Sequence, residues 1–470
     1  MANSRENGLM QKKVNSIHFV GIGGIGMSGI AEVLLNLGYE ISGSDLHRSD
    51  TTERLKKLGA KVAVGHKAKN VCLADVVVTS TAVKEDNPEV KEAHRKNIPV
   101  IPRAEMLAEL LKMKFSVAVS GSHGKTTTTS MIATILAKGN LDPTIVIGGK
   151  LASIGSNARL GDGDIIVAEA DESDGSFLKL SPTIAIVTNI DREHLDYYPG
   201  INEIKDAFVK FSNIVPFYGS TVLCVDNEHV REILPLIKRK TITYGIKHNA
   251  DYTARGIKIS GDRLTYKLNY KTKMLGTVEL RVPGTFNVYN SLAAIAVCRE
   301  LNLDFEVIKE GLLAFSGVQR RMEIKGEVSG VTVVDDYGHH PTEIKETLAA
   351  ARQVWKKRVI VVFQPHRFSR TRALFDEFTA AFADADVLIL NDIYPASEEP
   401  IPGINSAALW AAIRETGHPK VEYIAGEKET VKYLLDMVRP KDVVITLGAG
   451  NIYKTGELLL KKLASRKKRK

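Results

Sequence analysis

The sequence predicts an α/β protein of three domains, each built on a mostly parallel sheet flanked by helices. Three observations support this prediction. The chain has 470 residues, roughly three times the usual length of one domain. Short apolar, β-prone runs alternate with segments of helical periodicity, a pattern typical of parallel sheets with crossover helices. Glycine-rich turns follow several of these runs, where parallel sheets usually bind their ligands.

The first predicted domain covers residues 1–111. Residues 17–21 are expected to form a strand that leads through the turn GIGGIG into a helix over 27–37, because the apolar side chains there recur at helical spacing. Apolar runs predict further strands at 40–44 and 76–81. The domain is therefore expected to resemble a dinucleotide-binding fold.

The turn of this first domain has three interpretations. Gly21, Gly23 and Gly26 match the spacing GxGxxG directly after a strand, and Asp45 follows the next strand. In dinucleotide-binding folds such glycines hold a pyrophosphate, and the acid binds a ribose. The start of a helix attracts any diphosphate, however, so a nucleotide sugar fits the turn as well as NAD does. A purely structural glycine turn is the third interpretation.

The second predicted domain covers residues 112–322 and contains the most informative motif. A strand over 115–120 leads into GSHGKTTTT, and a helix follows from about Thr126. In such a turn, backbone N–H groups surround phosphate oxygens, a lysine reaches the terminal phosphates and the next hydroxyl holds Mg²⁺. Lys125 is expected to be that lysine, exposed on the loop, and Thr126 the hydroxyl. The loop residues expected at the phosphates are Gly121, Ser122, His123, Gly124, Lys125, Thr126 and Thr127.

Two more strands of the second domain end in polar sequence. They are expected over 165–169 and 183–188, and they lead into EADESDGSF and TNIDREHLD. Mg²⁺ prefers oxygen ligands and shares them with substrate phosphates. Glu169 and His194 are therefore the predicted metal ligands, together with Thr126. The other acids could instead cap the turns that follow.

The end of the second domain is expected to change character. Residues 252–282 alternate in polarity and contain Gly-Asp at 261–262, which predicts an antiparallel meander. A helix is expected over 287–301, where apolar residues return at helical spacing.

The third predicted domain covers residues 323–470, forms a second dinucleotide-fold-like sheet and ends in a basic tail. DDYGHHP and HRFSRTR each follow a predicted strand. Arginine forks bind carboxylates bidentately, and Arg367 and Arg370 are spaced to act together at a helix start. A solvated charged face is the competing interpretation. The strands are expected over residues 331–335, 358–363, 387–391 and 443–447.

Composition and charge exclude several classes of protein. The formal net charge is +9, but five positive charges lie in residues 466–470, a short tail that is expected to be solvated. No apolar run approaches the roughly 18 residues that cross a bilayer, and the start of the chain lacks the apolar core of a signal peptide. We therefore expect no nucleic-acid binding, no stable membrane insertion and a cytoplasmic location. Cys72, Cys224 and Cys298 are widely spaced and should be free thiols, mostly buried.

Taken together, these motifs resemble those of the Mur ligases of bacterial cell-wall synthesis. The likeness extends from His18 to about Lys454 and is greatest to the branch that adds alanine. It implies a UDP-sugar domain, a central P-loop-type ATPase and an amino-acid domain, with ATP and Mg²⁺ as cofactors. The motifs that carry it are HFVGIGGIGMSG, GSHGKTTTT, EADESDGSF, TNIDREHLD, GTFNVYNSLAA, GVQRRME, DDYGHHPTEI, HRFSRTRAL and YPASEEPIPG.

The resemblance also implies an activity. The substrates would be UDP-N-acetylmuramate and L-alanine. The enzyme would join the alanine amine to the muramyl carboxylate through an acyl phosphate, with release of ADP and phosphate. This reaction belongs to peptidoglycan precursor synthesis. Protein partners are not indicated by the sequence and stay unknown.

Individual residues acquire roles from the same resemblance. Lys125, Glu169 and His194 would be the catalytic residues, and the first glycine turn would hold UDP-N-acetylmuramate instead of a dinucleotide. The residues implied to contact adenine, phosphate and ribose are Asn287, Asn290, Arg321 and Asp336. The residues implied to bind the nucleotide sugar are Gly23, Gly24, Ser44, Asp45, His66, Ser80, Thr81 and Arg103. The residues implied to form the amino-acid pocket are Tyr337, His339, Arg367 and Arg370.

The sequence departs from the family pattern at one position and leaves three alternatives. Phe286 stands where the family often has histidine, and EADESDGSF offers no carbamylated lysine, as expected for the alanine-adding branch.

An NAD-dependent dehydrogenase would leave the phosphate loop without a role. A ligase that adds a preformed peptide shares most motifs, but HRFSRTR with DDYGHHP favours a small amino acid with a free carboxylate. A non-catalytic nucleotide-binding protein would have lost its metal ligands, and they are intact.

Overall fold

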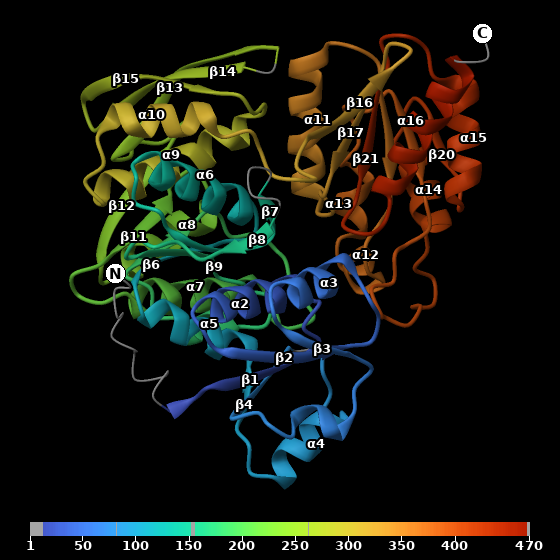
Figure 1. Cartoon of the computed structure of the whole chain (residues 1–470). Coiled ribbons are helices and arrows are strands. Elements are labelled where there is room, and N and C mark those ends of the chain that lie inside the picture. The colour runs from blue at the N-terminus through green and yellow to red at the C-terminus, as the bar shows by residue number, and fades with distance from the viewer. Residues whose placement is uncertain (1–12, 81, 152–155, 262, 468–470) are drawn as a thin grey trace.

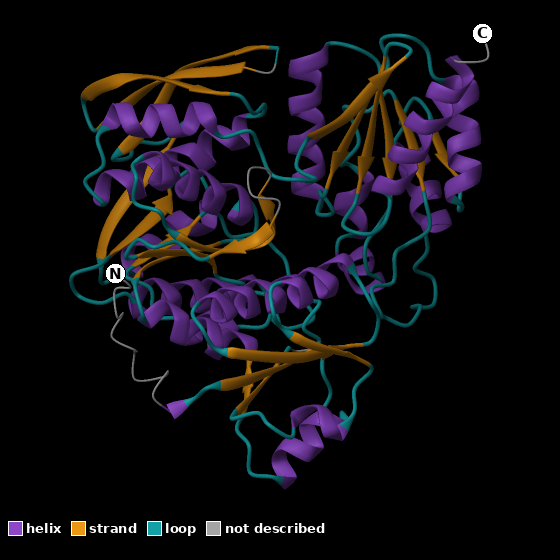
Figure 2. Cartoon of the chain, in the orientation of Figure 1, coloured by secondary structure: helices purple, strands orange, loops and turns teal. Residues whose placement is uncertain are grey.

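The protein folds into three α/β domains around three separate sheets (Figure 1), which confirms the predicted fold class. The computed structural model describes residues 13–80, 82–151, 156–261 and 263–467. Thr81, the aspartate of the Gly-Asp pair at 261–262 and the last residues of the basic tail lie outside the described residues. Figure 2 shows that helices cover the faces of the sheets, as expected for parallel strands with crossover helices.

The first sheet has five parallel strands in the order β3-β2-β1-β4-β5. The order reverses between β1 and β4, and ligands bind at the carboxyl ends of strands at such a position. The strands are β1 (Ser16–Val20), β2 (Glu40–Asp45), β3 (Lys61–Val64), β4 (Val76–Thr79) and β5 (Val100–Pro102). The helices are α2 (Ile25–Asn36), α3 (Asp50–Lys57), η1 (Ala68–Val71), α4 (Pro88–Arg95) and α5 (Arg103–Lys112).

The central sheet has ten strands in the order β15-β14-β13-β12-β11-β10-β6-β9-β7-β8. The predicted meander is confirmed, because β13, β14 and β15 pair antiparallel. The strands are β6 (Phe115–Ser120), β7 (Thr144–Leu151), β8 (Ser156–Arg159), β9 (Ile165–Glu169), β10 (Ile184–Val187), β11 (Ser220–Cys224), β12 (Lys240–Gly245), β13 (Tyr252–Ser260), β14 (Arg263–Tyr270) and β15 (Lys273–Leu280). The helices are α6 (Lys125–Lys138), η2 (Ser176–Lys179), α7 (Ile201–Ile214), α8 (Glu228–Ile233), η3 (Leu234–Leu236), α9 (Thr285–Glu300) and α10 (Phe305–Ala314).

The third sheet has six strands in the order β16-β17-β21-β18-β19-β20, and β16 is its antiparallel edge. Sequence reasoning missed β16, which is charged and half exposed, and β20, which is three residues long. The strands are β16 (Glu323–Val328), β17 (Val331–Asp336), β18 (Val359–Phe363), β19 (Val387–Leu390), β20 (Val421–Tyr423) and β21 (Val443–Leu447). The helices are α11 (Pro341–Trp355), α12 (Phe368–Ala373), α13 (Phe375–Thr379), α14 (Ser406–Glu415), α15 (Glu427–Met437) and α16 (Tyr453–Lys467).

The sheets bury continuous apolar strands, as parallel sheets covered on both faces should. All five residues of β18 and of β21 are buried. Two helices begin two residues earlier than predicted, α2 at Ile25 and α9 at Thr285, directly after the glycines that are their N-cap residues. Cys72 is exposed, whereas Cys224 and Cys298 are buried, and all three are free.

None of the described helices combines the length and apolar character needed to cross a membrane. The cytoplasmic location stays a prediction from the sequence.

Candidate active site

The phosphate loop connects β6 to α6 at the centre of the second sheet. Gly121 and Gly124 have φ angles of +123° and +84°, which favour glycine. A Cβ at Gly121 would clash with Thr188, and one at Gly124 would lie 2.5 Å from Oδ1 of Asn290. Both glycines are therefore required by backbone conformation and by close packing, as expected where N–H groups must surround a phosphate.

Lys125 is the first residue of α6, and its ammonium is held by the loop itself. Nζ donates to the carbonyl oxygen of Gly121 at 2.6 Å and to Oε1 of Glu172 at 2.7 Å. Only 18% of the Lys125 side chain and 2% of the Glu172 side chain are exposed. Burial opposes the charge, but Glu172, with Glu193, keeps the pKa of Lys125 above its ordinary value. The expectation of an exposed loop lysine was wrong, because a buried carboxylate lies beside it.

Glu169 ends β9 and points at the first turn of α6. Its carboxylate accepts hydrogen bonds from the Thr126 side chain and the backbone of Gly148, yet burial raises the pKa of Glu169. Oε1 is buried, and no partner among the described residues satisfies it. A buried carboxylate oxygen without a donor, next to a hydroxyl, is a chemically suitable ligand set for Mg²⁺. The structure thus places two of the three predicted metal ligands together.

The third predicted ligand, His194, lies in a second acidic group. Ligand atoms of Glu172, Glu193 and His194 lie within 4.8 Å of one another. His194 Nε2 is 3.3 Å from Glu172 Oε1. Burial opposes ionisation of Glu193, but His123 and His194 lower its pKa to about 2. Sequence reasoning did not single out Glu172 or Glu193, since only their burial distinguishes them from neighbouring acids.

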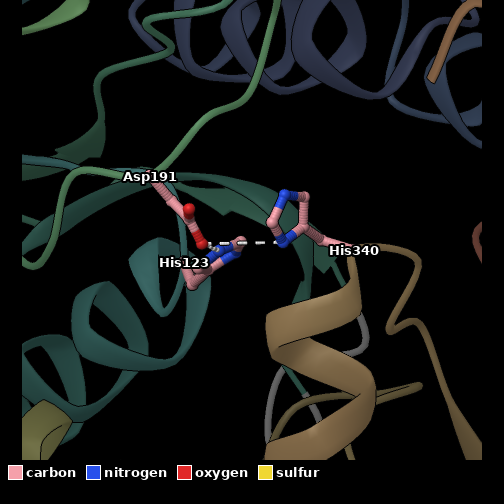
Figure 3. A group of neighbouring side chains, drawn as sticks. All are labelled: His123, Asp191 and His340. Atoms are coloured by element: carbon pink, nitrogen blue, oxygen red, sulfur yellow. Dashed lines mark hydrogen bonds and ion pairs between the residues drawn. The ribbon is translucent and has the colours of Figure 1, made fainter. Parts of the chain in front are cut away.

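A third group joins the phosphate loop to the third domain (Figure 3). His123 Nε2 lies 3.0 Å from Oδ2 of Asp191, and His340 Nδ1 lies 3.6 Å from the same oxygen. The Thr342 hydroxyl donates to that oxygen at 2.7 Å. Burial opposes protonation of His123, but Asp191 and then Glu343 raise its pKa to about 10. Hydrogen bonds already engage these atoms, so the group is an interdomain contact and not a metal site.

A cavity of about 670 Å³ opens between the central and third domains, and its walls include the phosphate loop. Such a volume suits a nucleotide-sized ligand. Phe286 lines this cavity at the position where the family often has histidine. Asn290 Nδ2 donates to Asn287 Oδ1 at 3.2 Å, which fixes both amides. The predicted ATP contacts in its walls are His123, Gly124, Thr126, Thr127, Asn287, Asn290, Arg321 and Asp336.

The predicted ribose contact, Asp336, is committed to the backbone. Its two oxygens accept the N–H groups of Met322 and Gly338, each at 2.7 Å. Burial raises the pKa of Asp336 to about 6, despite the nearby Arg321. Arg321 itself donates to Glu343 at 3.0 Å. A ligand would have to share these groups with their present partners.

Arg370 lies beside two imidazoles, those of His366 and His339. Its Nη1 lies 3.2 Å from Nδ1 of His366 and 3.3 Å from the His366 carbonyl oxygen. No described carboxylate lies within 4.0 Å of its guanidinium, although other arginines nearby have one. Burial, followed by the charge of Arg370, lowers the pKa of His339 to about 3 and that of His366 to about 4. The Arg370 cluster, made of Arg370, His339 and His366, thus combines a cation without a described carboxylate partner with two imidazoles whose neutral form is favoured.

Arg367 and Arg370 do not lie on one helical face as their spacing suggested, although the charge of Arg367 also helps to lower the pKa of His366. Arg367 is the N-cap residue of α12 with φ +70°, and its Nη1 lies 3.4 Å from Oδ2 of Asp196. Tyr337, the fourth predicted pocket residue, lies with its ring under the guanidinium groups of Arg320 and Arg321, at 4.9 and 5.4 Å. Arg370 and His339 are therefore adjacent, and the Tyr337 ring also contacts His339, with centroids 5.5 Å apart. Arg367 pairs with Asp196, but its buried Nε has no partner among the described residues.

The first domain holds its predicted residues at the ends of β1, β2 and β3. The Gly23 N–H donates to Oδ2 of Asp45 at 2.9 Å, and Gly24 is the N-cap of α2. The Ser44 hydroxyl lies 2.8 Å from Nδ1 of His66. Ser80 follows the end of β4. These residues form a group separate from the cavity.

One predicted residue joins this group to the central domain. Arg103 packs on the glycine turn, because a Cβ at Gly26 would lie 2.8 Å from its Nη1. Its Nη2 donates to Asp171 at 3.3 Å. The contact connects the first domain to the acidic sequence that follows β9.

The fold and the site define a class of protein: a three-domain α/β protein with a phosphate loop, buried acidic groups beside it and a nucleotide-sized cavity between domains. Family models described as "Mur ligase family, catalytic domain", "Mur ligase middle domain" and "Mur ligase, glutamate ligase domain" match residues 16–115, 119–298 and 320–450. The chain belongs to the Mur ligase family.

Individual relatives agree with this assignment. A UDP-N-acetylmuramate–L-alanine ligase of Syntrophus aciditrophicus is 66% identical over 97% of this chain and 95% of its own. A relative of the same name from Geotalea daltonii is 60% identical over 97% of this chain and 99% of its own. The crystal structure of the UDP-N-acetylmuramate-alanine ligase of Thermotoga maritima matches with a TM-score of 0.82, at 31% identity, over 96% of this chain and 99% of that one.

Proposed function

We propose that this chain is an ATP-dependent ligase that joins L-alanine to the carboxylate of UDP-N-acetylmuramate, in peptidoglycan precursor synthesis. Relatives named for this activity match nearly the whole chain. One observation in the structure carries the proposal. His339, beside Arg370, has its Nε2 only 3.9 Å from Oε1 of Glu193 in the acidic group near Lys125. A guanidinium suited to bind a carboxylate therefore lies next to a site suited to Mg²⁺ and a triphosphate.

The first step activates the muramyl carboxylate, which is a poor electrophile. Lys125 and the N–H groups of residues 121–127 hold the triphosphate and neutralise charge as the γ-phosphoryl group moves to a carboxylate oxygen. The bond from phosphorus to the bridging oxygen breaks, and ADP leaves. Thr126, Glu169 and His194 would hold Mg²⁺, which supplies further positive charge at the phosphate oxygens.

The second step forms the amide. Arg370 binds the alanine carboxylate with two parallel hydrogen bonds, so that the amine is held near the acyl phosphate. The amine attacks the acyl carbon and loses a proton, and the tetrahedral oxyanion collapses with release of phosphate. The contact between His123, Asp191 and His340 keeps the third domain against the phosphate loop, which excludes water from the acyl phosphate.

Measurement of ADP release tests this proposal. We expect turnover only when ATP, Mg²⁺, UDP-N-acetylmuramate and L-alanine are all present, and none when a preformed peptide replaces L-alanine. Equal ADP release without the nucleotide sugar would refute the ligase assignment. A calorimetric titration with tight NAD binding and no affinity for UDP-N-acetylmuramate would favour a dehydrogenase instead.

A further inference from the structure

A fully buried carboxylate lies beneath the substrate residues of the first domain. Glu89, in the first turn of α4, has no exposed surface. Its Oε2 accepts a hydrogen bond from the Ser44 hydroxyl at 2.6 Å and lies 3.3 Å from Nε2 of His18. Its Oε1 accepts from Nδ2 of Asn70 at 2.5 Å and from the Lys67 backbone at 3.1 Å. Four groups, from β1, β2 and the η1 segment with its N-cap residue, therefore converge on one side chain.

Glu89 is ionised at neutral pH. Burial opposes its charge, but the hydrogen bonds from His18, Ser44 and Asn70 outweigh that cost and lower its pKa to about 2. The helix dipole acts in the same direction, because Glu89 lies in the first turn of α4. An ionised carboxylate is only an acceptor, so every group that contacts it must supply the hydrogen.

This requirement sets the direction of the hydrogen bonds that follow. The Ser44 hydroxyl has one hydrogen, and it goes to the carboxylate. Ser44 must then accept from Nδ1 of His66, 2.8 Å away, so that Nδ1 carries the imidazole hydrogen. In the neutral ring, Nε2 of His66 is left with a free lone pair. No described residue hydrogen-bonds to this nitrogen, and 17% of the side chain is exposed.

We propose that Glu89 is a positioning residue for the nucleotide sugar, which acts through Ser44 to fix the tautomer of His66. Nε2 of His66 is then a hydrogen-bond acceptor. Its ligand partner is a donor, either a sugar or ribose hydroxyl or the imide N–H of uracil, and not a phosphate oxygen. The inference rests on the proposed function for the identity of the ligand.

A merely structural Glu89 would affect stability without setting the direction of these bonds. Glu89→Gln separates the two roles, because the amide can donate to Ser44 and the serine hydroxyl then donates to Nδ1 of His66. The variant should therefore carry its His66 hydrogen on Nε2. ¹⁵N NMR of the full-length, ligand-free protein, with His66 assigned by a His66→Gln variant, reports which nitrogen is protonated.

The kinetic consequence should be confined to one substrate. We expect Glu89→Gln to raise the KM for UDP-N-acetylmuramate about ten- to hundredfold, because the ligand donor meets another donor. The kcat and the KM values for ATP and L-alanine should change less than about twofold. Glu32→Gln is the matched control, because Glu32 is also a buried carboxylate of this domain but pairs with Arg54. It should leave all three KM values unchanged.

Each outcome decides the question. A wild-type His66 with its hydrogen on Nε2, or an unchanged KM in a folded Glu89→Gln enzyme, overturns the inference. If that variant does not fold, Ser44→Ala replaces it. An unchanged KM for UDP-N-acetylmuramate in Ser44→Ala would also overturn the inference. Failure of the wild-type enzyme to use UDP-N-acetylmuramate would refute the proposed function instead, and the tautomer of His66 would still test the role of Glu89.

Discussion

The phosphate-loop site and the Arg370 cluster adjoin each other, yet their charges are arranged in opposite ways. Lys125 is paired with Glu172 at 2.7 Å, and Glu169 and Glu193 add further carboxylates around it. Arg370 has no described carboxylate within 4.0 Å. The first site therefore has an excess of acid and the second an unpaired cation. The charge that each site lacks indicates its ligand: a metal cation in one and a carboxylate in the other.

Buried histidines sharpen this contrast. His123 and His194, near the acids of the central domain, have raised pKa values. His339 and His366, near Arg370, have pKa values of about 3 and 4 because of burial and the neighbouring guanidinium. The acids thus favour the protonated imidazole at His123 and His194, and the arginine favours the neutral imidazole at His339 and His366. His340 differs, because burial and the charge of His123 lower its pKa despite Asp191.

The largest expected effect follows from removal of the phosphate-loop cation. Lys125→Ala should lower kcat by about 10²–10³ or more, because an electrostatic stabiliser of phosphoryl transfer is lost. Its melting temperature should also fall, because Glu172 is left buried without its cation. Steady-state ADP release and circular dichroism measure the two effects. Lys138→Ala, at the exposed end of the same helix, is the control, and full activity in Lys125→Ala would refute the phosphate-loop assignment.

A smaller effect is expected from a change of Arg370. Arg370→Lys keeps the charge but loses the bidentate geometry. The KM for L-alanine should rise about ten- to hundredfold, while those for ATP and UDP-N-acetylmuramate stay within about twofold. Arg372→Lys, exposed on the same helix, should have no effect. Weaker nucleotide-sugar binding with unchanged alanine dependence would move Arg370 out of the amino-acid pocket.

Glu172→Gln tests the role of the buried carboxylates around Lys125. The change keeps the shape of the side chain but removes the charge that holds Lys125 and lies 3.3 Å from His194. We expect kcat to fall about tenfold and the Mg²⁺ requirement to rise, since partners that orient metal ligands have effects of this size. Asp174→Asn, which alters an acid that caps a turn in the same segment, should change neither quantity. Equal effects of both variants would contradict a specific role for Glu172.

The smallest effect concerns the contact that keeps the two sites adjacent. Thr342→Val removes the hydroxyl that bonds to Asp191. Because Thr342 is exposed, the loss should lower kcat only about two- to fivefold, without a change in nucleotide-sugar affinity. Glu377→Gln breaks another exposed interdomain ion pair, with Arg192, and should leave kcat unchanged. An unchanged kcat in Thr342→Val would mean that this hydrogen bond does not help to hold the domains together during turnover.

Local motifs in the sequence predicted the phosphate loop, but the sequence did not show which side chains contact each other in the fold. GSHGKTTTT is contiguous, so its role could be inferred without the fold, and the rule that ligands lie at strand ends pointed to Glu169 and His194. Glu172 could not be chosen among the acids of EADESDGSF, because only its burial distinguishes it. Glu89 lies in PEVKEAHR, which reads as a surface helix, and its partners are distant in the chain.

The arginine pair shows a different limit. A spacing of three residues places two side chains on one face only if both belong to the helix. Helix α12 begins at Phe368, and Arg367 lies before it with φ +70°. Its side chain therefore pairs with Asp196, although its charge still acts on His366 beside Arg370.

The comparison of L-alanine with L-alaninamide tests most directly whether Arg370 is held unpaired for a substrate carboxylate. The amide keeps the attacking amine but lacks the negative charge. We expect wild-type kcat/KM to favour L-alanine by about a hundredfold, and Arg370→Gln to lose most of that preference with an unchanged KM for ATP. If Arg370→Gln discriminated between the two amines as well as the wild-type enzyme does, the assignment of Arg370 to the substrate carboxylate would be wrong.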